Sequence, residues 1–414
     1  MNVNKKIIYR LIKLLFPHRL LRIIFILKEK ILFNDQHIEI KKFTIKNEHV
    51  FFGYYDISPF SKNDKYILAQ KTSITNRPPL KNDLLSVGYF NIDDNNKFIE
   101  LGKTSTWNWQ QGSRLQWFNK DKQNEKIIYN KIISGKYGSV VQNVSSGKII
   151  REYNSPIYSI PDSGKYAITL DFGRLGVYRP GYGYINYNYK NNEKAPKDDG
   201  MWLLDMDTGN VELLFSIDKI SKIESQGSMK NAIHYFNHPC VNINGDRFLF
   251  LHIWIAGVKR FTRLLTSDIY GKNICVLNNQ GLSSHYCWKT NTQILSYALE
   301  KDNKKGFFIY EDLSDKVFKY AWDFMKEDGH PTFSIKGKVV CDTYPNRFSQ
   351  QLLYTYDESR NDYRKILSFF NPLTFKGETR CDLHPRWNYD GDKICVDSAE
   401  NSGYRSMHII SDKR

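Results

Sequence analysis

One structural unit recurs along most of the chain, and this repetition limits the folds available to it. The unit has an aromatic or His-containing strand, a polar turn with Gly or Asp, a second apolar strand and a third strand rich in tyrosine or aliphatic residues. Its starts lie roughly 45–55 residues apart, as in propeller blades, apart from one longer interval. The starts are Phe51, Trp107, Pro156, Phe236, Ser284, Gly329 and Asp382. The repeats predict an all-β fold, a seven-bladed β-propeller.

The turns within the units are those of tight β-hairpins. They read SKNDK, PDSGK, INGDR, SIKGK and YDGDK, and such turns need residues that tolerate a positive φ. Aromatic residues make up 14% of the chain, which suits the pleated surface of a sheet.

Two segments fall outside the regular repeats. Residues 37–45 (HIEIKKFTI) form a lone alternating strand, while the last unit is one strand short. We therefore expect residues 37–45 to supply the outer strand of the last blade of a propeller domain spanning 37–414. An insertion at about 172–199, rich in Gly, Tyr and Asn, is expected either as a rim loop that contacts a ligand or neighbour or as a disordered excursion.

Residues 1–36 have a different character. Within residues 5–33, Lys6, Arg10 and Lys13 share one helical face and Ile8 and Leu15 lie on the opposite one. This predicts a basic amphipathic helix on an anionic membrane surface, although a helix packed on the propeller would fit too. No uninterrupted apolar run is long enough for a membrane span or a secretory signal. We expect a cytoplasmic protein, peripheral on the inner face of the membrane.

The charge and the cysteines restrict the function classes. The formal net charge of +16 could attract acidic glycans, phosphates or nucleic acid. Nucleic acid is not expected, because the chain has no zinc-finger, RNP or helix-turn-helix pattern. It also lacks a GxSxG motif, a P-loop and a Rossmann glycine pattern. The six cysteines show no CxxC spacing and are expected as free buried thiols.

Four histidines occupy the same point of four successive units: His238, His285, His330 and His384. The first strand of each blade lines the central channel of a propeller, so these side chains should converge and could bind a divalent transition metal. Each His could instead cap its strand by bonding to the backbone of the next blade. Asp382 shares a strand face with His384 and is a candidate carboxylate ligand or a turn cap.

Arginines and aromatic residues near these strands indicate that guanidinium groups and planar aromatic rings line the mouth of the central channel. Guanidinium groups pair with carboxylates in a bidentate manner, and aromatic faces stack on sugar rings. The candidates are Arg114 and Arg179 for catalysis and Arg380, Arg386, Trp288 and Tyr286 for substrate binding. Trp in a blade strand is also ordinary core material.

The stretches NHPCVNINGDRFLFLH, SHYCWKTNTQILSYAL and LHPRWNYDGDKICVDS resemble the later blades of oligogalacturonate lyases (polysaccharide lyase family 22), over roughly residues 200–410. The resemblance implies a seven-bladed propeller that cleaves short galacturonate oligomers by β-elimination with histidine-bound manganese. It implies a base role for His238 and metal ligation by His285 and His384.

The chain departs from that family's pattern at three places. Asp382 stands where the family has a histidine, and Thr379-Arg380 stand near the place of a glutamine. Gly200-Met201 replace an arginine expected before WLLDMD. The chain is also similar to uncharacterised propellers associated with bacterial surface-polysaccharide synthesis.

Two functions therefore remain open. One is a carbon–oxygen lyase acting on an acidic oligosaccharide or polysaccharide, with a divalent metal, Mn²⁺ by the resemblance, as its cofactor. The other is a non-catalytic glycan-binding or scaffold propeller in membrane-associated surface-polysaccharide biosynthesis, which the basic N-terminal segment favours.

Overall fold

The computed structural model describes residues 37–414 except 76, 95–96, 119–124, 186–188, 190, 402 and 413–414. The expected amphipathic helix, residues 1–36, lies outside the described residues. Among the described residues, no helix combines the length and the apolarity that crossing a membrane requires.

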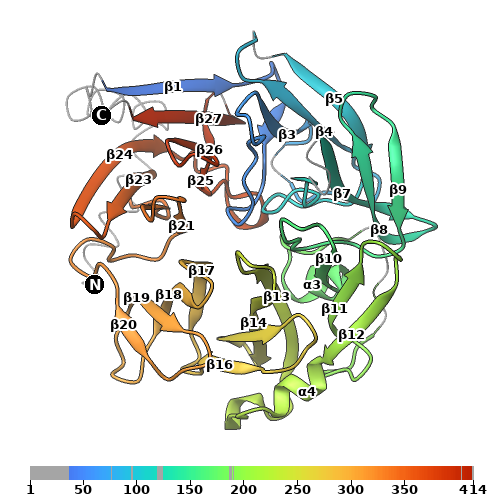
Figure 1. The fold of residues 1–414 in the computed structure, drawn as a ribbon, viewed down its shortest axis with the longest axis vertical. Coiled ribbons are helices and arrows are strands. Elements are labelled where there is room, and N and C mark those ends of the chain that lie inside the picture. The colour runs from blue at the N-terminus through green and yellow to red at the C-terminus, as the bar shows by residue number, and fades with distance from the viewer. Residues whose placement is uncertain are drawn as a thin grey trace.

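Seven antiparallel sheets surround a central axis, which confirms the seven-bladed propeller (Figure 1). The first two blades contain β2 (His49–Phe51), β3 (Tyr66–Thr72), β4 (Leu85–Asn91) and β5 (Phe98–Thr104), then β6 (Gln116–Trp117), β7 (Lys126–Ile133), β8 (Lys136–Asn143) and β9 (Ile149–Tyr153). The fourth and fifth contain β13 (Ile233–Val241), β14 (Arg247–Ala256), β15 (Lys259–Asp268) and β16 (Cys275–Asn278), then β17 (Ser283–Trp288), β18 (Gln293–Leu299), β19 (Lys305–Glu311) and β20 (Val317–Lys319). The sixth contains β21 (Thr332–Phe333), β22 (Val339–Asp342), β23 (Gln350–Asp357) and β24 (Asp362–Phe370).

The last blade joins the two ends of the described chain. Its order is β1 (Ile38–Phe43), β27 (Tyr404–Asp412), β26 (Lys393–Asn401) and β25 (Arg386–Trp387). β1 lies antiparallel to β27, with Ile38 opposite Asp412 and Phe43 opposite Met407. Pairing of strands from the two ends completes the fourth strand of the last blade and closes the ring.

The third blade departs from the four-stranded pattern. It has β10 (Tyr166–Leu170), β11 (Gly200–Asp205) and β12 (Val211–Ser216), and its inner strand is reduced to a bridge between Ser159 and Ile168. The insertion between β10 and β11 begins with the helix α3 (Phe172–Tyr178), whose N-cap is Asp171. After β12 come α4 (Ile217–Lys222) and the 3₁₀ turn η1 (Gly227–Met229), and a second 3₁₀ turn, η2 (Gly377–Thr379), precedes β25.

The antiparallel order gives the propeller two unlike faces. In each four-stranded blade the hairpins between strands one and two and between strands three and four point the same way; we call this the hairpin face. The opposite side, the connection face, carries the links between blades and the hairpins between strands two and three. β1 begins on the hairpin face, since Ile38 lies beside Asp412 at the end of β27.

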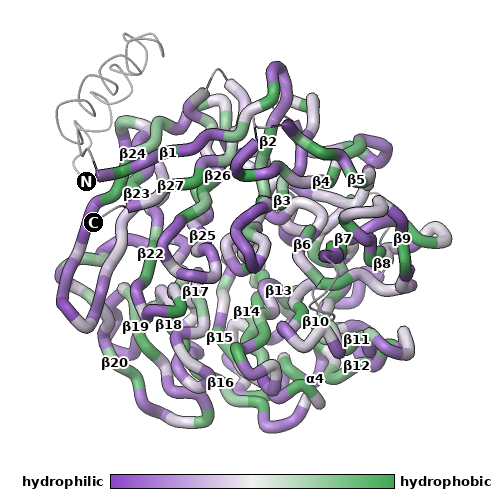
Figure 2. The backbone as a smooth tube through the Cα atoms, turned by 45° about the horizontal axis from the view of Figure 1, so that its top comes forward, coloured by the Kyte–Doolittle hydropathy of each residue, from purple (hydrophilic) through white to green (hydrophobic). Residues whose placement is uncertain are grey.

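The predicted turns have the backbone that their sequences require. The left-handed residues at these five positions are Asp64, Gly164, Gly245, Gly337 and Gly391. Figure 2 shows hydrophilic stretches at many turns and hydrophobic stretches within strands, as expected for blades that bury their faces against each other. Neighbouring blades are also linked by tryptophans: Trp117 Nε1 donates to Pro59 O, and Trp387 Nε1 donates to Thr332 O.

Candidate functional site

Four histidines meet at the axis, and they come from four successive blades. His238 lies in β13, His285 in β17, His330 just before β21 and His384 just before β25. The His285 and His330 ring centroids are 4.1 Å apart, and those of His330 and His384 are 4.4 Å apart. Equivalent inner-strand positions therefore do converge at the centre of the ring.

Two tyrosines that sequence reasoning overlooked complete this cluster. Tyr54 follows β2 in the first blade, and its ring stacks on His238 with centroids 4.5 Å apart. Tyr158, in the third blade, places its hydroxyl 2.8 Å from His238 Nδ1. Their signal was present, because FFGYYD and PIYSI stand at the same point of their units as FNHPC does. A search for repeated histidines alone could not find them.

The hydrogen bonds of His238 define its tautomer. Its backbone N–H donates to Asn237 Oδ1 at 2.9 Å, which turns the Asn237 amide nitrogen toward His238 Nε2 at 3.0 Å. Because an amide N–H can only donate, Nε2 must carry the lone pair. The proton is then on Nδ1 and is donated to the Tyr158 hydroxyl, while the Tyr54 hydroxyl donates to Nε2 at 3.0 Å.

His238 is held in the neutral form by its surroundings. Burial lowers its pKa well below 6.5, and the positive charges of Arg179 and Arg114 add to this effect. Its backbone has a φ of 53°, in the same left-handed region as His384 at 47° and Arg114 at 57°. A neutral imidazole with an unprotonated Nε2 can accept a proton.

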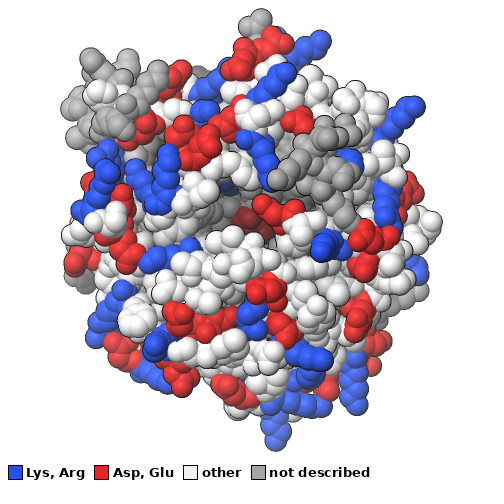
Figure 3. Space-filling model, in the orientation of Figure 1, with Lys and Arg blue, Asp and Glu red and all other residues white. Residues whose placement is uncertain are grey.

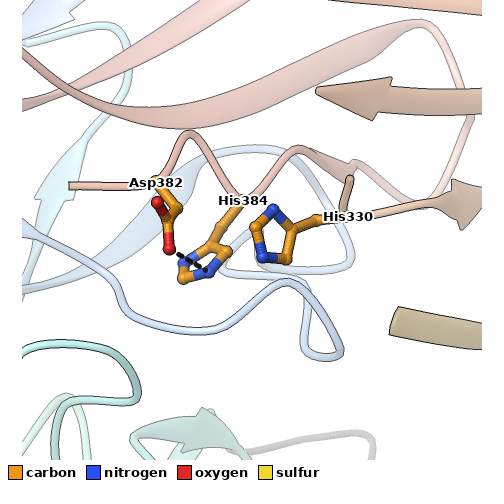
Figure 4. A group of neighbouring side chains, drawn as sticks. All are labelled: His330, Asp382 and His384. Carbon is orange, nitrogen blue, oxygen red and sulfur yellow. Dashed lines mark ion pairs between the residues drawn. The ribbon is translucent and has the colours of Figure 1, made fainter. Parts of the chain in front are cut away.

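A second part of the cluster has the composition of a metal site. His330, Asp382 and His384 are buried, and they offer one ligand atom each within 4.8 Å of one another. Figure 4 shows the three side chains turned toward a common space, with Asp382 and His384 on one segment and His330 on the neighbouring one. His384 Nε2 lies 3.9 Å from Asp382 Oδ2.

Both imidazoles present a free nitrogen to that space. His330 Nδ1 donates to Asp342 Oδ1 at 2.8 Å, and His384 Nδ1 donates to Gly53 O at 2.8 Å. The Nε2 atoms of both rings and Asp382 Oδ1 are buried without a hydrogen-bond partner in the described part of the chain. Buried polar atoms normally have partners, so two lone pairs and a carboxylate oxygen left in one pocket fit a divalent cation.

Asp342 holds His330 and His384 in place. It is fully buried, and besides His330 Nδ1 it accepts from the backbone N–H of His330 at 2.7 Å and of His384 at 3.1 Å. One carboxylate thus ties together the two segments that carry the imidazoles. Outer partners of this kind orient metal ligands and raise their basicity.

The local charges favour a cation at His330. Burial by itself lowers the pKa of His330, but the carboxylates of Asp342 and Asp382 outweigh it and raise the pKa above 6.5. Burial raises the pKa of Asp382, and Arg380 and His330 reverse this, so that the Asp382 pKa lies below its usual range. An ionised Asp382 beside His330 would attract a metal ion.

His285 lies next to the group rather than within it. Its Nδ1 is 3.0 Å from Asp328 Oδ1, and the Tyr344 hydroxyl is 3.4 Å from its Nε2. Burial lowers the pKa of His285, against the attraction of Asp328. The ligand atoms that gather within 4.8 Å belong to His330, Asp382 and His384 among the described residues.

Arg114 and Arg386 are buried beneath the cluster. Arg114 makes a bidentate pair with Asp56 at 3.0 and 2.8 Å and donates to Tyr158 O. Arg386 pairs with Asp397 at 2.9 Å and donates through Nε to Tyr54 O. Both guanidiniums therefore hold the backbone of the tyrosines that contact His238.

Arg179 and Arg380 lie higher, on the connection face. The guanidinium of Arg179 is 4.7 Å from the Tyr182 ring centroid, and that of Arg380 is 5.6 Å from the same centroid. Arg380 also donates to the Tyr182 hydroxyl and to Asp382 Oδ2, the latter at 2.7 Å. Tyr182 in turn lies 5.3 Å from His238 between centroids.

Tyr286 and Trp288 lie on the other side of the histidines. The Tyr286 hydroxyl donates to His238 O at 2.5 Å. Trp288 Nε1 donates to Cys240 O at 3.0 Å, in the manner of the other inter-blade tryptophans. Both residues line a cavity of about 410 Å³ whose other walls include the hairpin residues Ile243 and Ile335. The structure therefore separates them from Arg179 and Arg380.

Acidic and basic side chains are interspersed over the face seen in Figure 3. The positive charges next to the histidines come from the four individual arginines described above and not from a broad basic surface. Specific pairing therefore matters more at this site than net charge.

Comparison with known proteins relates the chain to structures but not to sequences. No family model matches it, and no curated protein matches it. An oligogalacturonate lyase from Vibrio parahaemolyticus superposes with a TM-score of 0.61 at 10% identity, covering 91% of this chain and 94% of that chain. An oligogalacturonate lyase in complex with manganese superposes with a TM-score of 0.64 at 10% identity, covering 90% and 92%. The chain shares the fold of these propellers over almost its whole described length.

Proposed function

We propose that the protein is a divalent-metal-dependent enzyme that cleaves acidic oligosaccharides by β-elimination. The observation that carries this proposal is the pairing of two unlike sites at one axis. A buried His330–Asp382–His384 group offers three unpartnered ligand atoms, and a neutral His238 beside it keeps an unprotonated Nε2. The likeness to an oligogalacturonate lyase in complex with manganese supports the same chemistry.

The residues that would hold the metal are His330 and His384 through Nε2 and Asp382 through its carboxylate. His285 and water or substrate oxygens could complete the coordination. Manganese suits this mixture of imidazole and carboxylate ligands. When bound, the ion would act as a Lewis acid on the uronate carboxylate and make the proton on carbon 5 easier to remove.

The chain's own residues would carry the proton transfers. His238 Nε2 takes the proton from carbon 5, and the electron pair of that C–H bond forms the double bond to carbon 4. The bond from carbon 4 to the glycosidic oxygen breaks, and the leaving oxygen takes a proton. The Tyr54 hydroxyl, 3.0 Å from His238 Nε2, is the donor best placed for this. Arg380, beside Asp382 and Tyr182, would hold the substrate carboxylate.

The test is direct. Full-length protein with Mn²⁺ should release from oligogalacturonates products with the ultraviolet absorbance of unsaturated uronates, and a chelator should abolish the signal. A wild-type protein that binds no Mn²⁺ and forms no unsaturated product from any uronate oligomer would overturn the proposal.

One observation favours binding without turnover as the second candidate. His238 Nε2 already receives hydrogen bonds from Asn237 and Tyr54, so a substrate C–H must displace one of them. A glycan-binding or scaffold propeller would retain both. Tight binding of acidic oligosaccharides with no absorbance change in the presence of Mn²⁺ would select this alternative.

Membrane attachment through residues 5–33 is part of the proposal, at the cytoplasmic side. The propeller begins on the hairpin face, at Ile38, opposite the connections that carry Arg380 and Asp382. A bound segment would thus leave the connection face open to solvent. Full-length protein should sediment with phosphatidylglycerol vesicles and not with phosphatidylcholine vesicles. Replacing Lys6, Arg10 and Lys13 with Gln should release it; unchanged sedimentation would contradict this part.

A further inference from the structure

Tyr182 connects a distant loop to the histidine cluster. It belongs to the insertion between β10 and β11 and is buried, and its ring lies 5.3 Å from His238 and 6.1 Å from Tyr54 between centroids. The preceding residue, Gly181, has a φ of 90°, and a methyl group there would lie only 3.4 Å from the Cα of Glu378. The insertion therefore packs closely on the η2 segment from the opposite part of the ring.

This contact brings two guanidiniums to one phenol ring. Arg179 is 4.7 Å and Arg380 is 5.6 Å from the centroid of Tyr182. Arg380 has Asp382 as its carboxylate partner. Arg179 has no acidic partner within ion-pair distance in the described part of the chain, and it is half-buried. Its charge is thus left for an external anion.

A third arginine, Arg260, adds to this positive charge. It stands at the start of β15 on the connection face, is exposed, and forms no ion pair with a described acidic residue. Burial of part of the side chain lowers its pKa, and the charge of Arg179 lowers it further. Tyr235 lies near both arginines. Its ring stacks on that of Tyr178, the residue before Arg179, with centroids 6.2 Å apart. Burial raises the pKa of its hydroxyl, and the charges of Arg179 and Arg260 oppose this.

The three arginines differ in their distance from the chemistry. Arg179 is close enough to lower the pKa of His238, after burial and His285. Arg260 lies farther out, in β15, two strands away from β13, which carries His238. Arg380 contacts Asp382 of the metal group directly. The positive charge therefore extends outward from the histidines, along the connection face.

We propose that Arg179 and Arg260, with the Tyr235 hydroxyl, form a second carboxylate-binding subsite, outside the one at Arg380. The protein would then bind acidic oligosaccharides with at least two charged sugar residues in preference to a single acidic sugar. This inference rests on the proposed function for the class of ligand. A planar guanidinium binds a carboxylate through two parallel hydrogen bonds. The subsite at Arg380 and the subsite at Arg179 and Arg260 would then bind the carboxylates of two different sugar residues.

The experiment compares ligand lengths in a matched pair of variants. Galacturonate, digalacturonate and trigalacturonate are titrated into full-length protein by calorimetry, with Mn²⁺ and with a chelator. Arg260→Gln should weaken trigalacturonate binding by about 10-fold or more, as expected when a charged hydrogen-bond partner is lost, and leave galacturonate binding unchanged. Lys259→Gln removes the same charge from the neighbouring exposed residue and should change neither. Arg179→Gln should reproduce the length dependence.

The outcomes separate this inference from the proposed function. Equal binding of trigalacturonate by Arg260→Gln and wild type, equal weakening for all three ligands, or no binding by wild type overturns the subsite. If trigalacturonate binds with the expected dependence but no unsaturated product forms, the subsite stands and the lyase is wrong. If unsaturated product forms and Arg260→Gln keeps the wild-type kcat/KM, the lyase stands and the subsite is wrong.

Discussion

The two sides of the histidine cluster are built from the same repeat but differ in how many ring nitrogens have hydrogen-bond partners. On one side His238 has partners on both ring nitrogens, namely Tyr158 on Nδ1 and Tyr54 with Asn237 on Nε2. On the other side His330 and His384 are bonded through Nδ1 only, and their Nε2 atoms have no partner among the described residues.

The difference shows that register alone does not assign a chemical role. The partners around His238 are neutral hydroxyl and amide groups, and burial lowers its pKa. Those around His330 are carboxylates, and its pKa is raised. An equivalent backbone position therefore holds a neutral histidine among hydroxyl and amide groups in one blade and a histidine between carboxylates two blades later.

One large expected effect is on metal affinity. His330→Gln removes one of three ligands and should weaken Mn²⁺ binding by more than about 100-fold, beyond the 10–100-fold cost of losing an outer partner. The matched His238→Gln should bind Mn²⁺ as wild type does. Both are measured by calorimetric titration with Mn²⁺. Equal weakening in the two variants would mean that the cluster acts as one site.

The next effect is on turnover. His238→Gln should lower kcat on oligogalacturonate by about 10²–10⁴-fold, the usual contribution of a general base, at saturating Mn²⁺. The absorbance of unsaturated product gives the rate. A variant with more than half of the wild-type kcat would assign proton removal to another group.

Asp342→Asn tests how the metal side is supported. The substitution keeps the shape but removes the charge that His330 Nδ1–H and two backbone N–H groups contact. We expect a loss of about 10-fold in Mn²⁺ affinity, with tautomer and base function at His238 intact. If affinity does not change while His330→Gln abolishes it, Asp342 serves only the fold.

Tyr158→Phe tests the support of His238 from the other side. It removes the acceptor for the Nδ1 proton and should lower kcat by about 10-fold, at the low end for a positioning hydrogen bond of about 1.5 kcal/mol, without a change in Mn²⁺ affinity. Tyr356→Phe, which removes a hydroxyl bonded to Asn361 far from the cluster, is the control and should leave kcat as in wild type.

The last effect is on folding stability and concerns a histidine away from the cluster. His408 is fully buried, and burial lowers its pKa to about 3. Below pH 6.5 the unfolded chain binds a proton there and the folded chain does not, so folding stability falls as the pH drops from about 6.5 toward 3. Between pH 7 and 5 the loss is about 2 kcal/mol. Urea unfolding of His408→Gln should show a shallower pH slope; an unchanged slope would contradict neutral burial.

Much of the architecture was predictable from particular residues. The hairpin sequences with Asp64 and Gly245 require left-handed turn residues and have them, and their spacing predicts seven blades, which the structure confirms. His330 and His384 were recognised as candidates because they repeat. Tyr54 and Tyr158 were missed because the same position holds a different residue type in their units.

The roles of the arginines could not be inferred from their positions in the chain. In the sequence, Arg114 stands in the second repeat, Arg179 in the insertion, and Arg380 and Arg386 on either side of His384. In the structure Arg114 and Arg386 are buried against Asp56 and Asp397, and only Arg179 and Arg380 face the connection side. Strand pairing and contacts between blades decide which carboxylate each guanidinium meets. Asp56 is 58 residues from Arg114, in the preceding blade, whereas Asp397 is 11 residues from Arg386, in the same blade.

The sequence by itself determined the number of blades and the convergence of four histidines, because strand alternation and turn chemistry are local and repeat with a fixed period. Only the tertiary structure decided which histidine nitrogen stays free. That depends on Asp342, Gly53 and Asn237, and the contact between Gly53 and His384 joins the first blade to the last. Lone pairs are assigned by hydrogen-bond partners, and those partners are set by how the ring closes.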